Sequence, residues 1–362
     1  MTIVTLDRRN VSSDEIMRFV EKLVQGEEAN LLILENIESR GSEFVSVIVR
    51  TFNSAMYLHE ALNSIINQAY DGPLEILLSY DRGTTDSTLE ILLAFLSVVD
   101  RNNVIVKVLF HNNTSPFRDV ELALNYAEGR FITFLDYDNV FMINKISEQK
   151  NFMLNNGSVF SFSSVALIGQ NGKVSSEPYV RVPNNYQDLA TLLTGNYVDI
   201  NTIMIEKSFI RAVLIPMLSQ ISESYFDWIF EDYLFGILGS ATKNLDFFDK
   251  ILVGYRIHDS NLSAIAPKTS TTLDGKISAF ISTSRSLERT HKTYSAFVVI
   301  NGRMHITGSV TVGLFEVLSQ DGLKIYKTSQ GVIGDIESAV LRILKLFLAI
   351  FTRLSSKFLS HN

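Results

Sequence analysis

Hydrophobic and polar positions follow a regular order from Phe44 to about residue 138. Short apolar runs of the kind that form buried strands are each followed by a segment with apolar residues at helical spacing. In order, the segments are FVSVIVRTF, MYLHEALNSIINQ, LEILLSY, DSTLEILLAFLSVV, VIVKVLF, RDVELALNYAEG and RFITFLDYD. Strands that alternate with helices predict an α/β fold with a mostly parallel, Rossmann-like central sheet flanked by helices.

The chain before this region has a different pattern. Ser12 or Ser13 precedes a predicted amphipathic helix over DEIMRFVEKLV, and the short apolar strand LLILE follows it. The polar break Glu-Ser-Arg-Gly-Ser then separates these two elements from the first regular strand. We therefore predict that residues 1–42 are an N-terminal helix and strand added to the α/β domain.

After residue 151 the pattern becomes less regular. The segments VFSFSSVALIG and VDINTIMIE predict shorter strands, and a polar and aromatic stretch, SESYFDWIFEDYLFG, comes next. Alternating apolar segments around Asp321–Gly322 predict a hairpin in a small mixed or β extension over residues 266–335.

Residues 336–362 predict a basic amphipathic helix that ends this C-terminal extension. Its apolar stripe over residues 336–358 suits the surface of the cytoplasmic membrane. The same stripe also suits the chain's own core or a second subunit of a homo-oligomer. The pattern leaves both interpretations open.

Composition narrows the function classes. A chain of 362 residues with 46% hydrophobic positions is long enough for one large globular domain and an appendage. The net charge of −7 argues against a nucleic-acid partner, which would need a basic face. With no cysteine there is no thiolate nucleophile and no cysteine-based zinc site. The lack of a secretory signal or a long uncharged apolar run predicts a cytoplasmic protein, with a peripheral contact to the inner face of the cell membrane as a further expectation.

Candidate chemistry lies at the strand ends, because ligands of such sheets bind beyond the carboxyl ends of the strands. The segment GRFITFLDYDN places Asp136 and Asp138 where both carboxylates can reach one point. Hard oxygen ligands of this kind suit Mn²⁺ or Mg²⁺. A D-x-D pair also occurs by chance in solvated turns, and its position at a strand end favours the metal site.

The two preceding strand ends carry further polar residues. Thr51 and Asn53 follow the first strand and are candidate nucleotide contacts, although Asn53 also suits a helix cap. After the second strand, Asp81 can accept a hydrogen bond from a nucleotide base, and Asp86 suits a structural cap of the next helix.

Taken in order, these segments resemble family 2 glycosyltransferases, which have the GT-A fold. VSVIVRTFNSAMYLHEALNSIINQ is similar to the family's opening strand and helix, LEILLSYDRGTTDST to its nucleotide loop, and GRFITFLDYDN to its metal strand. The resemblance covers roughly residues 44–262. It implies a catalytic domain over residues 43–265, with a nucleotide-binding half (43–150) and an acceptor half (151–265).

The resemblance also implies an activity, namely inverting, metal-dependent transfer of a hexosyl or N-acetylhexosaminyl group. The donor is expected to be a nucleoside-diphosphate sugar, UDP-linked, and the acceptor a hydroxyl of a bacterial surface glycan or glycolipid. No Q-x-x-R-W motif occurs, so we expect a non-processive enzyme.

Site roles follow from the same resemblance. Asp81 is expected to hold the base, Asp136 the diphosphate and metal, and Asp138 the metal. Arg82 stands where the family usually has a second aspartate, which is expected to alter the base or ribose contact.

The segment FDWIFEDYLFG resembles the family's E-D motif. It implies that Asp232 is the general base and Glu231 the neighbour that orients the acceptor. VGYRIHDSNLS resembles the end of the catalytic domain, which suggests Arg256 for the diphosphate and His258 for the metal.

Two alternatives remain at this point. One is a nucleotidyltransferase of similar fold, although RTFNSAM lacks the glycine-rich phosphate loop such enzymes usually have. The other is a non-catalytic scaffold at the membrane surface, which the retained carboxylates disfavour.

Overall fold

The computed structural model describes residues 2–26, 30–35, 41–99, 101–112, 116–169, 172–187, 192, 196–214, 231–258, 297–300 and 303–306. The predicted hairpin turn at Asp321–Gly322 and the predicted helix over residues 336–362 lie outside these ranges. The chain divides into two compact units, the first being Met1–Arg181, Val198–Ala212 and Asp246–His258, and the second Val182–Tyr197, Val213–Leu245 and Asp259–Asn362.

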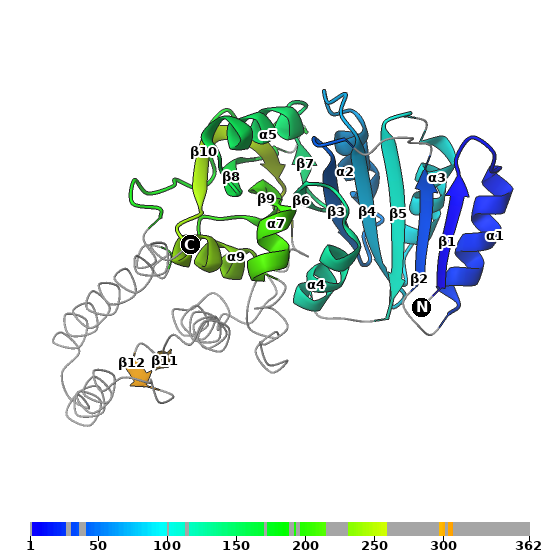
Figure 1. The fold of residues 1–362 in the computed structure, drawn as a ribbon. Helices are drawn as coiled ribbons and strands as arrows, with labels where there is room; N and C mark the ends of the chain where they lie inside the picture. Colours follow the sequence, from blue (N-terminus) through cyan, green and yellow to red (C-terminus); the bar gives the residue numbers. More distant parts are fainter. Residues whose placement is uncertain are drawn as a thin grey trace. The chain divides into compact units, whose positions relative to one another are not determined.

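The first unit contains a single large sheet with helices packed along it (Figure 1). Its strands are β1 (Thr2–Asp7), β2 (Asn30–Glu35), β3 (Val45–Thr51), β4 (Leu74–Asp81), β5 (Val104–His111), β6 (Phe131–Asp136), β7 (Val140–Phe141), β8 (Phe160–Leu167), β9 (Ile203–Glu206) and β10 (Asp246–Tyr255). Its helices are α1 (Ser13–Val24), α2 (Leu58–Ile66), α3 (Thr88–Val98), α4 (Pro116–Tyr126), α5 (Lys145–Asn156), η1 (Ile200–Thr202) and α7 (Lys207–Phe209), and the turn η2 (Ile210–Leu214) continues from α7.

The strand order is β1-β2-β5-β4-β3-β6-β9-β8-β10-β7. The central strands β5, β4, β3 and β6 are parallel to one another, while β9 runs antiparallel between β6 and β8. The expected α/β architecture with a mostly parallel central sheet is therefore confirmed. Every strand and helix predicted between residues 44 and 138 is present, with ends shifted by a few residues.

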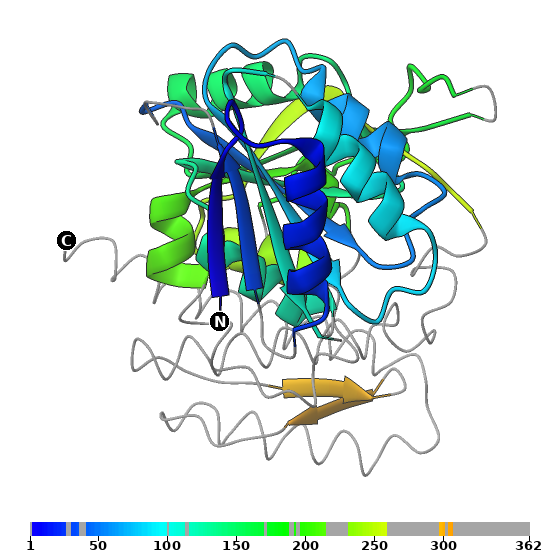
Figure 2. The same ribbon diagram turned by 90° about the vertical axis from the view of Figure 1, so that its right-hand side faces the viewer.

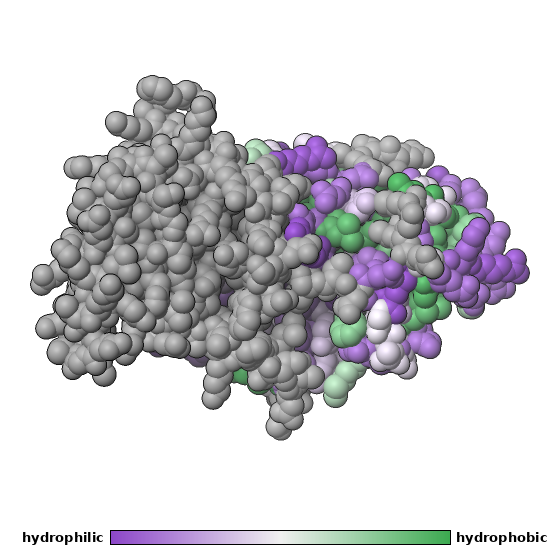
Figure 3. All heavy atoms as spheres, turned by 90° about the horizontal axis from the view of Figure 1, so that it is seen from below, coloured by the Kyte–Doolittle hydropathy of each residue, from purple (hydrophilic) through white to green (hydrophobic). Residues whose placement is uncertain are grey.

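The N-terminal segment extends this same sheet. Ser12 caps α1 in a reciprocal capping box with Glu15, as predicted, and β2 pairs antiparallel with β5. Strand β1, which the sequence pattern did not predict, pairs parallel with β2 and forms the sheet edge. None of its residues is buried, and Val4 and Leu6 pack against the core from this edge. Figure 2 shows β1 and β2 beside α1, and Figure 3 shows mainly hydrophilic surface with small hydrophobic patches at this end of the molecule.

A buried polar network joins the amino ends of the central strands. Lys107 Nζ lies 2.7 Å from Glu75 Oε2, and the Ser46 hydroxyl donates to Glu75 Oε1 at 2.7 Å. The Gly129 N–H donates to the Ser46 hydroxyl at 2.7 Å, and a Cβ at position 129 would lie 2.4 Å from the Ser46 nitrogen. Only glycine fits this approach, so the chain enters β6 in a fixed register with β3.

The second unit is described in part. Helix α9 (Glu231–Ala241) contributes the Ser240 hydroxyl, which donates to the Gln187 carbonyl at 2.6 Å. Strands β11 (Phe297–Ile300) and β12 (Arg303–Ile306) pair antiparallel as a separate two-stranded sheet.

Lys145 has a fully buried amino group in the first unit. Its Nζ bonds the Thr133 hydroxyl and lies 4.5 Å from the centre of the Phe141 ring. Burial lowers the pKa of Lys145 well below its ordinary value. The Thr133 hydroxyl also donates to the Ile203 carbonyl, so it keeps a partner if Lys145 is replaced.

We predict that Lys145→Met changes the pH dependence of unfolding. Because the unfolded chain binds a proton that the folded chain does not, wild-type stability rises with pH up to the ordinary lysine range, and this rise is absent in the variant. The free energy of unfolding of the variant relative to wild type should therefore fall by on the order of 1–3 kcal/mol between pH 7 and pH 10. Urea unfolding at both pH values measures this. Lys22→Met, at an exposed position, is the control and should show no such change; an equal pH profile for Lys145→Met would contradict the prediction.

Candidate active site

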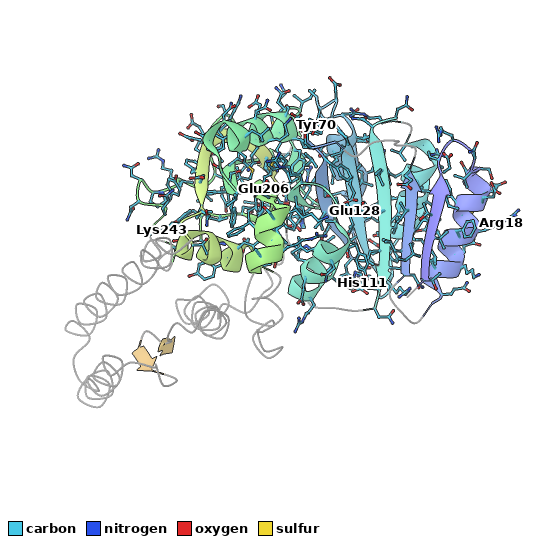
Figure 4. The ribbon with its side chains drawn as sticks, viewed as in Figure 1. Arg18, Tyr70, His111, Glu128, Glu206 and Lys243 are labelled. Atoms are coloured by element: carbon cyan, nitrogen blue, oxygen red, sulfur yellow. The ribbon has the colours of Figure 1, made fainter. Side chains whose placement is uncertain are left out.

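The candidate residues of the first unit gather at the carboxyl ends of the central strands. In the register, Arg50 of β3 lies opposite Asp136 of β6, and Asp81 of β4 lies opposite His111 of β5. Figure 4 labels His111 at the lower end of β5, with Tyr70 at the opposite end of the sheet. The loops after β3, β4 and β6 therefore share one edge, as expected for a ligand site of a parallel sheet.

Asp136 ends β6 with both carboxylate oxygens engaged. Arg50 Nη2 lies 2.5 Å from Asp136 Oδ1, and Arg50 Nε donates to the same oxygen at 3.2 Å. The Asn201 amide group donates to Asp136 Oδ2 at 3.3 Å and accepts from the Asp136 N–H at 2.5 Å. Arg50 and Asn201 thus fix both the carboxylate and the backbone of this residue.

Asp138 lies two residues further on and is buried. Its Oδ2 is 2.9 Å from His258 Nε2, which brings two of the three predicted metal ligands together across 120 residues of chain. Burial, together with the charge of Asp136, raises the pKa of Asp138, and the His258 contact opposes this rise. A cation bound at this point would offset the repulsion between the carboxylates of Asp136 and Asp138.

Arg256 ties the end of β10 to the same loop. Its N–H donates to Asn139 Oδ1 at 2.9 Å, and its Nε donates to the Asp138 carbonyl at 3.0 Å. Its Nη2 pairs with Glu60 of α2 at 2.6 Å, and the guanidinium lies 4.6 Å from the centre of the Tyr57 ring. The arginine therefore reaches the predicted site, with Glu60 and Tyr57 as partners.

Tyr57 was not predicted from the sequence. Its ring also lies 5.1 Å from the His258 ring, centre to centre. Arg256 and His258 are thus both held against one aromatic side chain at the start of α2.

Asp199 is a third carboxylate near Asp136 and Asp138. Burial raises its pKa to about 6, with the charges of the other two carboxylates acting in the same direction and a hydrogen bond from Asn201 opposing them. The Asn201 N–H and amide donate to Asp199 Oδ1 at 2.9 and 2.8 Å. Asn201 therefore links Asp199 to Asp136.

The loop after β4 holds Asp81 in place. Its Oδ1 accepts the Gly83 N–H at 2.8 Å, and the residue is almost completely buried. Arg82, predicted to affect the base or ribose contact, donates to the Leu23 carbonyl at 2.8 Å and to Asn112 Oδ1 at 3.2 Å. In this structure Arg82 thus joins the nucleotide loop to the end of α1.

The two candidates after β3 have structural contacts. The Thr51 hydroxyl donates to the Ser79 carbonyl at 2.9 Å, and Thr51 is buried. Asn53 has a positive φ of 49° and its Oδ1 accepts the Thr85 N–H at 2.8 Å. Asn53 thereby joins the loops after β3 and β4, and its left-handed backbone is one that asparagine tolerates better than most residues.

The predicted base and its neighbour begin α9 in the second unit. Glu231 is buried, and Asp232 is partly exposed with its Oδ1 bonded to the Tyr233 N–H. Both lie in the first turn of the helix, where the helix dipole stabilises negative charge.

The donor set at Asp138 and His258 fits a divalent cation with two protein ligands. Across the described ranges, no group of three or more His, Cys, Asp or Glu side chains is arranged to hold a metal. Mg²⁺ and Mn²⁺ commonly take one or two protein ligands and complete their shell with water and substrate phosphates. Both carboxylates have protein partners here, Asp138 through His258 and Asp136 through Arg50 and Asn201.

We predict that Arg50→Ala destabilises the fold at neutral pH by on the order of 2 kcal/mol, because it leaves the partly buried Asp136 carboxylate without the cation that pairs with it. Urea unfolding at pH 7 measures this loss. The exposed ion pair of Arg9 and Asp7, 3.1 Å apart, supplies the control. The loss of stability in Arg9→Ala should be at most a few tenths of the loss in Arg50→Ala. Equal losses in both variants would contradict the importance of the Arg50 contact.

A second prediction concerns Asp199→Asn. The folded-state pKa of Asp199 lies above its ordinary value of 3.8, so the folded chain binds more protons, and wild type loses stability as the pH rises from about 4 through about 6. The variant lacks this loss and its amide oxygen can still accept from Asn201. Its stability relative to wild type should therefore increase by about 2 kcal/mol between pH 4 and pH 7.5. Urea unfolding with a chelator present measures this increase. Asp71→Asn, at an exposed position, should give a flat difference, and a flat difference for Asp199→Asn would contradict the raised pKa that burial and the neighbouring carboxylates give Asp199.

Among the helices of the described segments, none is long and apolar enough to cross a membrane.

Among solved structures, the chain is similar to S. aureus TarS 1-349 in complex with UDP-GlcNAc. The sequence identity is 16% and the TM-score 0.43, and the match covers 74% of this chain and 99% of that one.

Two sequence relatives are more informative. An uncharacterized glycosyltransferase of Haemophilus influenzae is 28% identical over 182 residues, which are 50% of this chain and 70% of that protein. The Escherichia coli UDP-Glc:alpha-D-GlcNAc-diphosphoundecaprenol beta-1,3-glucosyltransferase WfaP is 26% identical over 227 residues, 61% of this chain and 80% of that protein. The model of Glycosyl transferase family 2 matches residues 46–211. Residues 46–211 therefore carry a domain of glycosyl transferase family 2, and the chain is a glycosyltransferase.

Proposed function

We propose that this chain transfers one hexosyl or N-acetylhexosaminyl group from a UDP-sugar to a hydroxyl of a lipid-linked bacterial surface glycan, with inversion at the anomeric carbon. The observation that carries the proposal is the meeting of Asp138 and His258 beside the ends of β3, β4 and β6. The family 2 domain favours this reading over a nucleotidyltransferase or a non-catalytic scaffold.

The substrates are proposed from similarity. WfaP is described as using UDP-Glc and an acceptor on diphosphoundecaprenol, and this chain covers most of its length. In the proposed complex Asp81 accepts from the base, and Arg256 contacts the diphosphate. Arg256 suits that role because a guanidinium binds phosphate oxygens in a bidentate manner.

Asp138 and His258 would hold Mn²⁺ or Mg²⁺ in the proposed complex, and such a cation neutralises charge on the leaving diphosphate. Arg50 and Asn201 hold Asp136 in place beside this point. Asp136 is thereby proposed as the residue that positions the loop and contacts the donor.

Asp232 is the proposed general base. It takes the proton of the acceptor hydroxyl while that oxygen forms a bond to the anomeric carbon and the bond to the UDP oxygen breaks. Attack from the face opposite the leaving group inverts the anomeric configuration, through an oxocarbenium-like transition state. Glu231, its neighbour, is proposed to orient the acceptor.

The proposed place of action is the cytoplasmic face of the membrane, where a diphosphate-linked lipid acceptor would be accessible. The apolar stripe of residues 336–358 is the proposed contact with that surface, and a homo-oligomer through the same stripe remains a second prediction. Both concern residues outside the described part of the chain.

Two variants test the assignment of roles. Asp138→Asn should abolish metal-dependent release of UDP from UDP-sugars, because the cation loses a carboxylate ligand. Asp232→Asn should lower kcat by about 100-fold or more and leave UDP-sugar affinity unchanged, because it removes only the base. A luminescent UDP assay with a panel of UDP-sugars and calorimetry measure these effects, with Asp71→Asn as the control that should match wild type. Equal UDP-sugar affinity with and without Mn²⁺ would contradict the metal role, and full turnover by Asp232→Asn would contradict the base.

A further inference from the structure

Two tyrosine rings form a parallel stack at the carboxyl end of β10. Tyr255 is the last residue of that strand, and Tyr179 lies in the segment that follows β8. Their ring centres are 5.8 Å apart and their planes differ by 10°. Tyr179 is 49% exposed, which makes it one of the more exposed large side chains among the described residues.

Backbone hydrogen bonds hold both rings on β8. The Tyr179 N–H donates to the Val165 carbonyl at 2.7 Å, and the Ser175 N–H donates to the Leu167 carbonyl at 2.8 Å. On the other side of β8, the Ile168 N–H donates to the Tyr255 carbonyl at 2.8 Å. Tyr255 packs against the hydrophobic core. The inner ring is therefore anchored, and the outer ring is presented to solvent by an ordered backbone.

The stack adjoins the candidate active site. Tyr255 directly precedes Arg256, which bonds the Asp138–Asn139 loop, and it is three residues from His258. Three residues of extended chain span at most about 11 Å. The backbone of Tyr255 thus lies within this distance of His258, beside the candidate active site.

The strand order separates the stack from the nucleotide loop. From Asp81 at the end of β4, the order runs β4-β3-β6-β9-β8-β10 to Tyr255. Five steps between neighbouring strands amount to about 24 Å. A base bound at Asp81 is out of reach of the stack, whereas a molecule that meets the donor's sugar beyond Asp138 approaches it.

We propose that Tyr179, backed by Tyr255, forms a platform for a pyranose ring of the acceptor glycan. The inference rests on the proposed function, since it assigns the acceptor part of the same site. The electron-rich face of an aromatic ring attracts the C–H groups of a sugar's apolar face. An exposed ring that is already fixed loses little conformational entropy when a ligand stacks on it.

Binding of simple glycosides to the full chain tests the platform without turnover. The probes are the methyl α- and β-glycosides of glucose, galactose, N-acetylglucosamine and N-acetylgalactosamine, observed by saturation-transfer NMR in the presence of UDP and Mg²⁺. We expect at least one glycoside to bind wild type, with saturation strongest on its ring C–H protons. Tyr179→Phe should bind it as wild type does, and both Tyr179→Leu and Tyr179→Gln should weaken binding at least fivefold.

The control is Tyr126→Leu, the same change at a partly exposed tyrosine of α4, which should bind as wild type. Thermal melting of every variant checks that it is folded. The absence of binding by wild type would overturn the platform. Equal binding by folded Tyr179→Leu or Tyr179→Gln would do the same and would leave the stack as a cover of the sheet.

A kinetic measurement separates the platform from the proposed function. With UDP-Glc as donor and α-D-GlcNAc diphosphate on a short alkyl chain as acceptor, Tyr179→Leu should raise the acceptor KM at least fivefold with a much smaller change in kcat. A drop in kcat at constant KM would overturn the platform. Failure of wild type to release UDP from any UDP-sugar would contradict the proposed function alone, and the glycoside experiment would still decide about Tyr179.

Discussion

Burial of neighbouring carboxylates at the end of β6 is the constraint around which the candidate active site is arranged. Burial raises the pKa of Asp199, and the charges of Asp136 and Asp138 act in the same direction. Arg50 pairs with Asp136, His258 pairs with Asp138, and Asn201 bonds both Asp136 and Asp199. These partners come from β3, from the chain after β10 and from η1. Balancing the charge at one point therefore joins three distant segments of the first unit.

At the opposite end of the sheet, a fully buried ion pair also joins several strands. Lys107 and Glu75 neutralise one another inside the sheet, and Ser46 and Gly129 add hydrogen bonds around them. This network sets the register at the amino ends of β3, β4, β5 and β6. Because register carries through a strand, the same pairing brings Arg50 level with Asp136 at the carboxyl ends.

Local patterns were enough to predict the central strands and the motif residues. Asp81, Asp136 and Asp138 each follow an apolar run directly, so their place at the sheet edge could be inferred from the sequence. Arg50, Asn201 and Tyr57 could not be inferred in this way, because their contacts join residues 86, 65 and about 200 positions apart. The sequence contains only two hints of these contacts. Arg50 stands next to Thr51, and the run Asp-Ile-Asn precedes β9.

The contacts of Arg82 and Thr51 show what a motif does not reveal. Both occupy motif positions, and in this structure their side chains also hold the loop to α1 and to β4. Strand β1 shows a related limit, since none of its residues is buried and only Val4 and Leu6 pack against the core. In each case the missing information is a tertiary contact and not a local preference.

The ion pair between Arg50 and Asp136 also has an evolutionary consequence. A single replacement of Arg50 leaves unbalanced charge in the site, and a single replacement of Asp136 leaves a half-buried guanidinium without its carboxylate. Either intermediate is handicapped, so the two positions are constrained to mutate jointly. Among descendants of this sequence, we therefore expect substitutions at positions 50 and 136 to occur together.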